Sequence, residues 1–140
     1  MTELPAGAAP ESSDQQTLLC IWLVDEDAGN NEILAPSLKS EPHVDCSRRF
    51  ASAASLLAAL EQEYPPDVIL LDLQMPAMNG IEVIQSVKNL APFVPVLMLT
   101  NFADSRYRQQ ALLAGASDIF LKGSSPGQII AAIRKALRSH

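Results

Sequence analysis

Short runs of consecutive apolar residues recur along the chain, and segments that contain polar residues, proline and glycine separate them. A short run that is apolar throughout is typical of a strand buried on both faces of a parallel sheet. The run over 43–50 is more polar, which favours a strand at the edge of the sheet. The expected buried strands cover residues 18–24, 68–71, 94–99 and 119–121.

Between these runs, apolar positions repeat with helical spacing. Ile129, Ile133 and Leu137 predict one buried face of a last helix. Ser125 and Gln128 are spaced as a capping box, which indicates where this helix begins.

Three further features mark helix ends. Gly115 is placed to end a helix whose last residues are 112–114. Residues 79–82 offer the start of an earlier helix. The first helix is expected near 30–40, but Pro36 lacks an N–H donor and would clash with the preceding turn. That helix is therefore expected to be kinked or to begin late.

The alternation of strands and helices predicts an α/β fold: a doubly wound, five-stranded parallel sheet with helices on both faces and right-handed crossovers. Residues 1–17 are small, polar and without periodicity, which predicts a disordered N-terminal tail. One domain over 18–140 then accounts for the rest of the 140 residues.

Composition narrows the function. Sixteen acidic and ten basic residues give a net charge of −6, which argues against direct nucleic-acid binding, because phosphate binding needs a basic face. No apolar run approaches the roughly 20 residues of a membrane span, and no signal peptide is evident. Cys20 and Cys46 lie in strand-like segments and resemble small buried hydrophobes of a reducing compartment. A cytoplasmic protein without a membrane partner is expected.

Reactive side chains follow directly on the expected strands. Asp25, Asp72, Thr100 and Lys122 come after the first, third, fourth and fifth strands. Because the carboxyl ends of parallel strands share one edge of the sheet, these groups should converge there. The competing interpretation is that they are simply hydrated residues at strand ends.

A cluster of carboxylates is costly without a counter-ion. Two like charges about 4 Å apart repel by about 4 kcal/mol at an effective dielectric of about 20. Oxygen ligands with positions left for water suit Mg²⁺. Carboxylates and a bound cation beside a hydroxyl and an ammonium could hold a phosphoryl group while one carboxylate attacks phosphorus.

Two motifs resemble the receiver domain of two-component response regulators. Residues 72–80 read Asp-Leu-Gln-Met-Pro-Ala-Met-Asn-Gly, which is similar to the phosphoacceptor loop of that family. Residues 113–122, which end in Lys122, are similar to its last strand and lysine. The resemblance extends over 18–137 and implies a flavodoxin-like (βα)5 fold with strand order 2-1-3-4-5.

The resemblance also implies roles for individual residues. Asp72 would accept a phosphoryl group from a sensor histidine kinase or a phosphotransfer protein, with Thr100 as the switch hydroxyl and Lys122 as the phosphoryl-binding lysine. The implied Mg²⁺ ligands are Asp25, Glu26, Asp72 and the backbone carbonyl of Gln74.

The resemblance further implies a signalling domain and not an enzyme, apart from its own phosphorylation and dephosphorylation. The phosphorylated chain would bind a second copy or a downstream output protein. The motifs are most similar to the subgroup with helix-turn-helix outputs, and no such domain follows in this sequence. Either an output domain has been removed or the regulator has a single domain.

The sequence departs from the family pattern at four positions. Glu26 stands where a second aspartate is usual, so either Glu26 or Asp27 could complete the metal site. Asn101 replaces a small residue, and Gly123 stands where a proline is common. Ile119 occupies the position of the switch aromatic, which predicts a muted or rerouted conformational change.

Two alternative functions follow from the same residues. One is an inactive receiver-like scaffold, which the departures at Glu26 and Ile119 would allow. The other is a phosphatase of the haloacid dehalogenase type, because residues 25–27 fit its Asp-x-Asp signature. That family needs a further acidic motif after the lysine, and residues 123–140 contain no aspartate or glutamate.

Overall fold

The computed structural model describes residues 18–25, 36–38, 40–72, 77–100, 105–121 and 124–138. The tail expected over 1–17 and the site residues Glu26, Gln74 and Lys122 lie outside these ranges. Most of the helix expected near 30–40 also lies outside the described residues. Its described part is a helical turn over 36–38, where the Ser40 N–H donates to the Pro36 carbonyl at 3.1 Å.

From the second strand onward strands and helices alternate as expected, and all strand pairs of the described residues are parallel. The strands in the described ranges are β1 (Leu19–Asp25), β2 (Val44–Phe50), β3 (Val68–Asp72), β4 (Val96–Thr100) and β5 (Asp118–Leu121). The helices there are α3 (Ala53–Gln62), α4 (Ala77–Leu90), α5 (Ser105–Ala114) and α6 (Pro126–Arg138).

The strand order is β2-β1-β3-β4-β5, which confirms the doubly wound sheet and its predicted order. The polar segment predicted as an edge strand is β2, at one end of this order, and β5 is at the other. Strands β3, β4 and β5 follow one another on one side of β1, and β2 lies on the other side of β1. The reversal of direction lies between β1 and β3, at the place where ligands bind in open α/β sheets.

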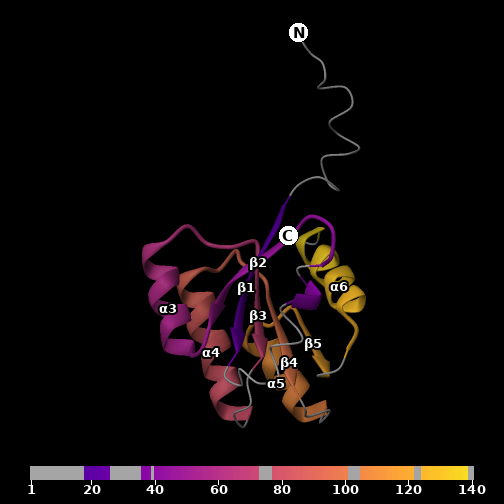
Figure 1. The fold of residues 1–140 in the computed structure, drawn as a ribbon. Helices are drawn as coiled ribbons and strands as arrows, with labels where there is room; N and C mark the ends of the chain where they lie inside the picture. The colour runs from indigo at the N-terminus through magenta and orange to yellow at the C-terminus, as the bar shows by residue number, and fades with distance from the viewer. Residues whose placement is uncertain are drawn as a thin grey trace.

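Two cores cover the two faces of the sheet, with α3 and α4 on one side and α6 on the other (Figure 1). Alternation along β3 shows how one strand serves both, because Ile69 and Leu71 belong to the first core and Val68 and Leu70 to the second. All four side chains are fully buried. This burial on both faces explains why the strand is apolar throughout.

Two predicted boundaries were wrong by two residues, and several strand ends by one. Strand β4 begins at Val96 and not at residue 94, because Pro95 has no N–H to donate to the ladder. Helix α4 begins at Ala77, two residues before the expected start at Asn79. In the sequence, Pro76 stands immediately before this start.

The predicted helix ends at Ser125 and Gly115 are confirmed. The Ser125 hydroxyl accepts from the Gln128 N–H and the Gln128 side chain accepts from the Ser125 N–H, both at 3.2 Å, which makes a capping box. Gly115 has φ +123° and follows α5. Its N–H donates to Leu112 and that of Ala116 to Ala111, the Schellman pattern.

Candidate functional site

The carboxyl ends of the central strands bring the predicted acidic residues together. Asp25 is the last residue of β1 and Asp72 the last of β3, and the two are register partners. Neighbouring parallel strands lie ~4.8 Å apart, so the two backbones that carry these carboxylates are direct neighbours. The pairing confirms that Asp25 and Asp72 share one edge of the sheet.

Thr100 lies at the same edge, at the end of β4, and β5 ends beside it. Asp72 pairs with Leu99, so Thr100 is the next residue along β4. Thr100 in turn pairs with Leu121, the last residue of β5 and the sequence neighbour of Lys122. The described strands therefore place Asp25, Asp72 and Thr100 side by side, in the order in which the sequence predicted them.

Burial singles out two of these residues. Among the described side chains, the buried polar residues are Asp72, 3% exposed, and Thr100, 4% exposed. A buried carboxylate loses its hydration and is costly unless another group compensates for its charge. Asp72 is therefore placed where a structural role alone would favour an apolar residue, as in the four preceding positions of β3.

The donors at this edge fit a hard divalent cation in part. Asp25 and Asp72 stand at paired positions of β1 and β3, and the carboxylate is a residue type that suits Mg²⁺. Over the described part of the chain no group of three or more acidic, histidine or cysteine side chains is arranged to hold a metal. The two other predicted ligands, Glu26 and the Gln74 carbonyl, lie outside it, as does Asp27.

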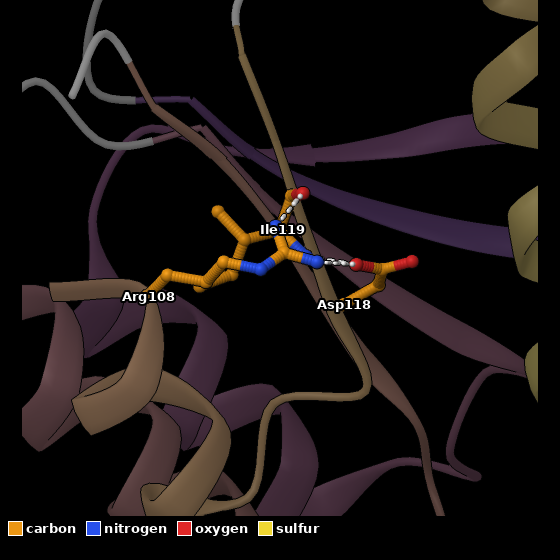
Figure 2. A network of polar contacts seen from close by, with 3 residues as sticks. All are labelled: Arg108, Asp118 and Ile119. Atoms are coloured by element: carbon orange, nitrogen blue, oxygen red, sulfur yellow. Dashed lines mark hydrogen bonds and ion pairs between the residues drawn. The ribbon is translucent and has the colours of Figure 1, made fainter. Parts of the chain in front are cut away.

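A polar network joins α5 to the start of β5 (Figure 2). The Arg108 guanidinium donates through Nη1 to the Ile119 carbonyl at 3.1 Å and through Nη2 to Asp118 Oδ1 at 3.2 Å. Asp118 Oδ1 also accepts from the Ile119 N–H at 2.8 Å. Sequence reasoning did not find this network, because Arg108 and Asp118 come from two elements and no motif relates them.

The position expected to carry a switch aromatic lies in the same region. Ile119 is 6% exposed and belongs to the core that includes Met98 and Tyr107. The Tyr107 hydroxyl donates to Met98 Sδ at 3.0 Å, and burial raises the pKa of Tyr107. The aromatic ring in this part of the core therefore comes from helix α5, and β5 contributes a β-branched side chain.

The two cysteines are structural, as the sequence indicated. Both are free thiols, Cys46 is buried and Cys20 is half-buried. They belong to opposite cores of the sheet. Burial, followed by the nearby Asp45 and Asp67 carboxylates, raises the pKa of Cys20, so its thiolate is disfavoured.

Among the helices that the structure describes, none has the length and apolar character of a membrane span.

A parallel sheet of this order with acidic and hydroxyl groups at one carboxyl edge defines a flavodoxin-like α/β protein with a polar site at that edge. The sequence matches the family model of the response regulator receiver domain over residues 21–134. The chain belongs to this family of two-component signalling domains.

Related proteins and structures agree with this assignment. Transcriptional regulatory protein LnrK of Bacillus subtilis is 35% identical over 83% of this chain and 52% of its own length. Response regulator protein VraR of Staphylococcus aureus is 40% identical over 72% of this chain and 48% of its own. The chain thus spans about half the length of these relatives.

Solved structures show the same architecture. A two-component response regulator of the LuxR family from Aurantimonas superposes with a TM-score of 0.78 at 26% identity, covering 89% of this chain and 88% of that one. The receiver domain of the response regulator NarL from Mycobacterium tuberculosis gives 0.74 at 25% identity, covering 89% and 99%. The flavodoxin-like fold is confirmed.

Proposed function

We propose that this receiver domain accepts a phosphoryl group on Asp72 from a sensor histidine kinase or a phosphotransfer protein and signals through phosphorylation-dependent binding. One observation carries the proposal. Asp72 is a buried carboxylate at the end of a central strand, next to the buried Thr100 and in register with Asp25. An acid in this place is explained by a chemical role better than by stability.

The transfer is a nucleophilic substitution at phosphorus. A carboxylate oxygen of Asp72 forms the new O–P bond, the P–N bond of the phosphohistidine breaks, and its electron pair returns to the imidazole nitrogen. The product is an acyl phosphate. Attack by water on its phosphorus later releases inorganic phosphate and restores the carboxylate.

The remaining residues bind the phosphoryl oxygens. The Thr100 hydroxyl donates a hydrogen bond, and Lys122 supplies an ammonium, which suits a small tetrahedral anion. Asp25, Glu26, Asp72 and the Gln74 backbone carbonyl would hold Mg²⁺. When bound, this ion supplies positive charge that offsets the repulsion between the carboxylates and the incoming oxygens.

The binding partner is proposed at the level of its class. The relatives LnrK and VraR are named as a transcriptional regulator and a response regulator, and both are longer than this chain. We infer that the phosphorylated domain binds either a second copy of itself or a downstream output protein, and that it does not itself bind nucleic acid.

The test is incubation of the chain with acetyl phosphate and Mg²⁺, followed by intact mass. The wild type should gain one phosphoryl group, and Asp72→Asn should gain none, because the amide is not a nucleophile here. Asp67→Asn is the matched control, since Asp67 precedes the same strand at its other end and is exposed. Removing Mg²⁺ with a chelator should prevent the gain.

Two results would contradict the proposal. If Asp72→Asn is still phosphorylated, the acceptor is another residue. If the wild type gains no mass with either acetyl phosphate or a phosphohistidine donor, the chain is the inactive receiver-like scaffold.

A further inference from the structure

An open cavity of about 660 Å³ lies between helix α6 and the segments that lead into β1, β2 and β3. We call it the α6 cavity. One side of it is formed by α6, and the other side consists of residues 18–19, 41–43 and 67. A volume of this size is typical of small-molecule sites in proteins.

The α6 cavity is separate from the candidate phosphorylation site. It lies at the starts of the strands, whereas Asp72 and Thr100 end theirs. Leu19, which lines the cavity, and Asp25 stand at the two ends of β1, and a rise of about 3.3 Å per residue places them about 20 Å apart. A molecule in the cavity would therefore not compete with phosphoryl transfer to Asp72.

Hydrogen bonds fix the side of the cavity that faces α6. The Cys20 N–H donates to Asp67 Oδ2 at 2.8 Å, and the Asp67 N–H donates to the Cys20 carbonyl at 3.0 Å. The Leu19 N–H donates to the His43 carbonyl at 2.8 Å. His43 has φ 61°, a left-handed conformation that is uncommon for a residue with a side chain. The cavity is thus pre-formed, which lowers the cost of ordering it around a ligand.

Helix α6 contributes two guanidinium groups to the cavity. Arg134 and Arg138 both line it and stand four residues apart, so they share one face of the helix with Ile130. Within the part of the chain that the structure describes, neither arginine side chain forms a hydrogen bond or an ion pair. Two guanidinium groups on one face suit the oxygens of a phosphate, which they can bind through parallel N–H donors.

Two carboxylates line the other side of the cavity. The Glu41 side chain accepts no hydrogen bond from the described residues, so both of its oxygens are open to a ligand. Asp67 uses Oδ2 for Cys20 and retains Oδ1. A carboxylate with two open oxygens fits a pair of neighbouring N–H donors. The ligand that satisfies both sides therefore carries an anionic group at one end and paired N–H donors at the other.

The space between the charged groups is aliphatic. Leu19, Ile130 and Leu137 line it, and a flat apolar ring can pack against such side chains. Guanine has this shape and presents N1–H and N2–H side by side on one edge, whereas adenine has an acceptor at N1. A free amino acid carries both charges but fills only a small part of the volume.

We propose that the α6 cavity binds a guanine nucleotide. Arg134 and Arg138 bind its phosphate, Glu41 accepts from the N1–H and N2–H edge of the base, and the base packs against the aliphatic side chains. The proposal does not depend on the function proposed above, because it uses none of the residues at the carboxyl edge of the sheet.

Isothermal titration calorimetry of the full chain with guanosine 5′-monophosphate tests the proposal. Saturable binding is expected. Adenosine 5′-monophosphate, which lacks the paired donors, and guanosine, which lacks the phosphate, should each bind at least about tenfold more weakly, the loss expected for a hydrogen bond to a charged group. Inorganic phosphate alone should also bind more weakly.

Variants assign the contacts. Arg134→Gln, Arg138→Gln and Glu41→Gln should each weaken binding of guanosine 5′-monophosphate by about tenfold or more. Lys135→Gln is the matched control, because Lys135 is the next residue of α6, has the same charge and does not line the cavity. Thermal unfolding shows which variants are folded. Arg138 and Glu41 are not buried, so their variants test the site even if Arg134→Gln does not fold.

Four results would overturn the proposal. The first is the absence of binding up to about 1 mM nucleotide, the weak end of specific association. The second is equal affinity for the guanine and adenine nucleotides, which would exclude the contact with Glu41. The third is equal affinity for inorganic phosphate, which would leave only a general anion site. The fourth is an equal loss in Lys135→Gln and Arg134→Gln, which would mean that the charge of α6 and not the cavity attracts the nucleotide.

Discussion

Helices α5 and α6 contribute to the cores on opposite faces of the sheet, and they are held there differently. Helix α6 buries Ile129, Ile130 and Ile133 against a core that includes Leu97 and Leu99 of β4. Helix α5 faces the core of Met98 and Ile119 with one tyrosine and one alanine.

The difference teaches that two helices of one small sheet can be held by different kinds of contact, α6 by apolar burial and α5 partly by exposed polar bonds. Burial of an isoleucine is non-directional and is lost all at once if the helix leaves. The bonds of Arg108 are directional and can be replaced by water. We therefore expect substitutions in α6 to change the free energy of unfolding, and those in α5 to change mainly its local behaviour.

The largest expected effect on the free energy of unfolding comes from a substitution in α6. Ile133 is fully buried, so Ile133→Ala should lower the free energy of unfolding by about 2–5 kcal/mol through lost transfer energy and the cavity left behind. Leu113→Ala in α5 is the matched control at an 86% exposed position, and should change it by no more than about 0.5 kcal/mol. Urea unfolding measures both. Equal losses would mean that α5 and α6 are anchored alike.

A smaller effect on the free energy of unfolding comes from two glycines, Gly115 after the end of α5 and Gly127 in the first turn of α6. Gly115 has φ +123°, and a Cβ there would lie 2.7 Å from Lys88 Cγ, whose side chain is fixed by a 2.7 Å bond from Nζ to the Val94 carbonyl. Gly115→Ala should therefore cost about 1–3 kcal/mol. Gly127→Ala in α6 meets no atom within 4 Å and should gain up to about 1 kcal/mol. A neutral Gly115→Ala would show that the end of α5 adapts freely.

The smallest effect is a pH dependence of α5. Burial raises the pKa of Tyr107 above its ordinary value of 10.0, so the folded state holds this proton more tightly than the unfolded state. The resulting stability is complete below pH 10.0 and is lost as the pH rises through the pKa of the folded state. The stability of the wild type relative to Tyr107→Phe should therefore fall in that range. Tyr64→Phe, at a 92% exposed position, is the control. If the stability of the wild type relative to Tyr64→Phe falls by the same amount over this pH range, the assignment to Tyr107 is wrong.

The sequence predicted most of the fold because its signals are local. Runs that are apolar throughout identify buried strands. The cap residues Ser125 and Gln128 act within the first turn of α6, and Gly115 acts at the end of α5. The errors also have local causes. Val94 is apolar and was included in a strand, but Pro95 has no N–H to donate, although its carbonyl accepts from the Ile69 N–H at 3.0 Å.

The candidate site could be predicted as far as it depends on strand ends. Asp25, Asp72 and Thr100 follow buried runs, and parallel strands bring such ends to one edge. The Arg108 network could not be predicted, because its bonds depend on how α5 is rotated against β5, and helix docking is decided by the whole core. The structure describes the positions of Asp25, Asp72 and Thr100, and the roles of all the site residues, Glu26, Gln74 and Lys122 included, stay predictions.

The far edge of the sheet contains an optical reporter. Trp22 is the single tryptophan of the chain and is 3% exposed. Its ring centroid lies 5.2 Å from that of Phe50, and the Arg48 guanidinium lies 5.4 Å above it. Strands β1 and β2, which hold these groups, are separated from β5 by β3 and β4. Tryptophan emission of the unlabelled protein should therefore follow global unfolding and the state of the β2 edge, and respond little to changes confined to the β5 edge.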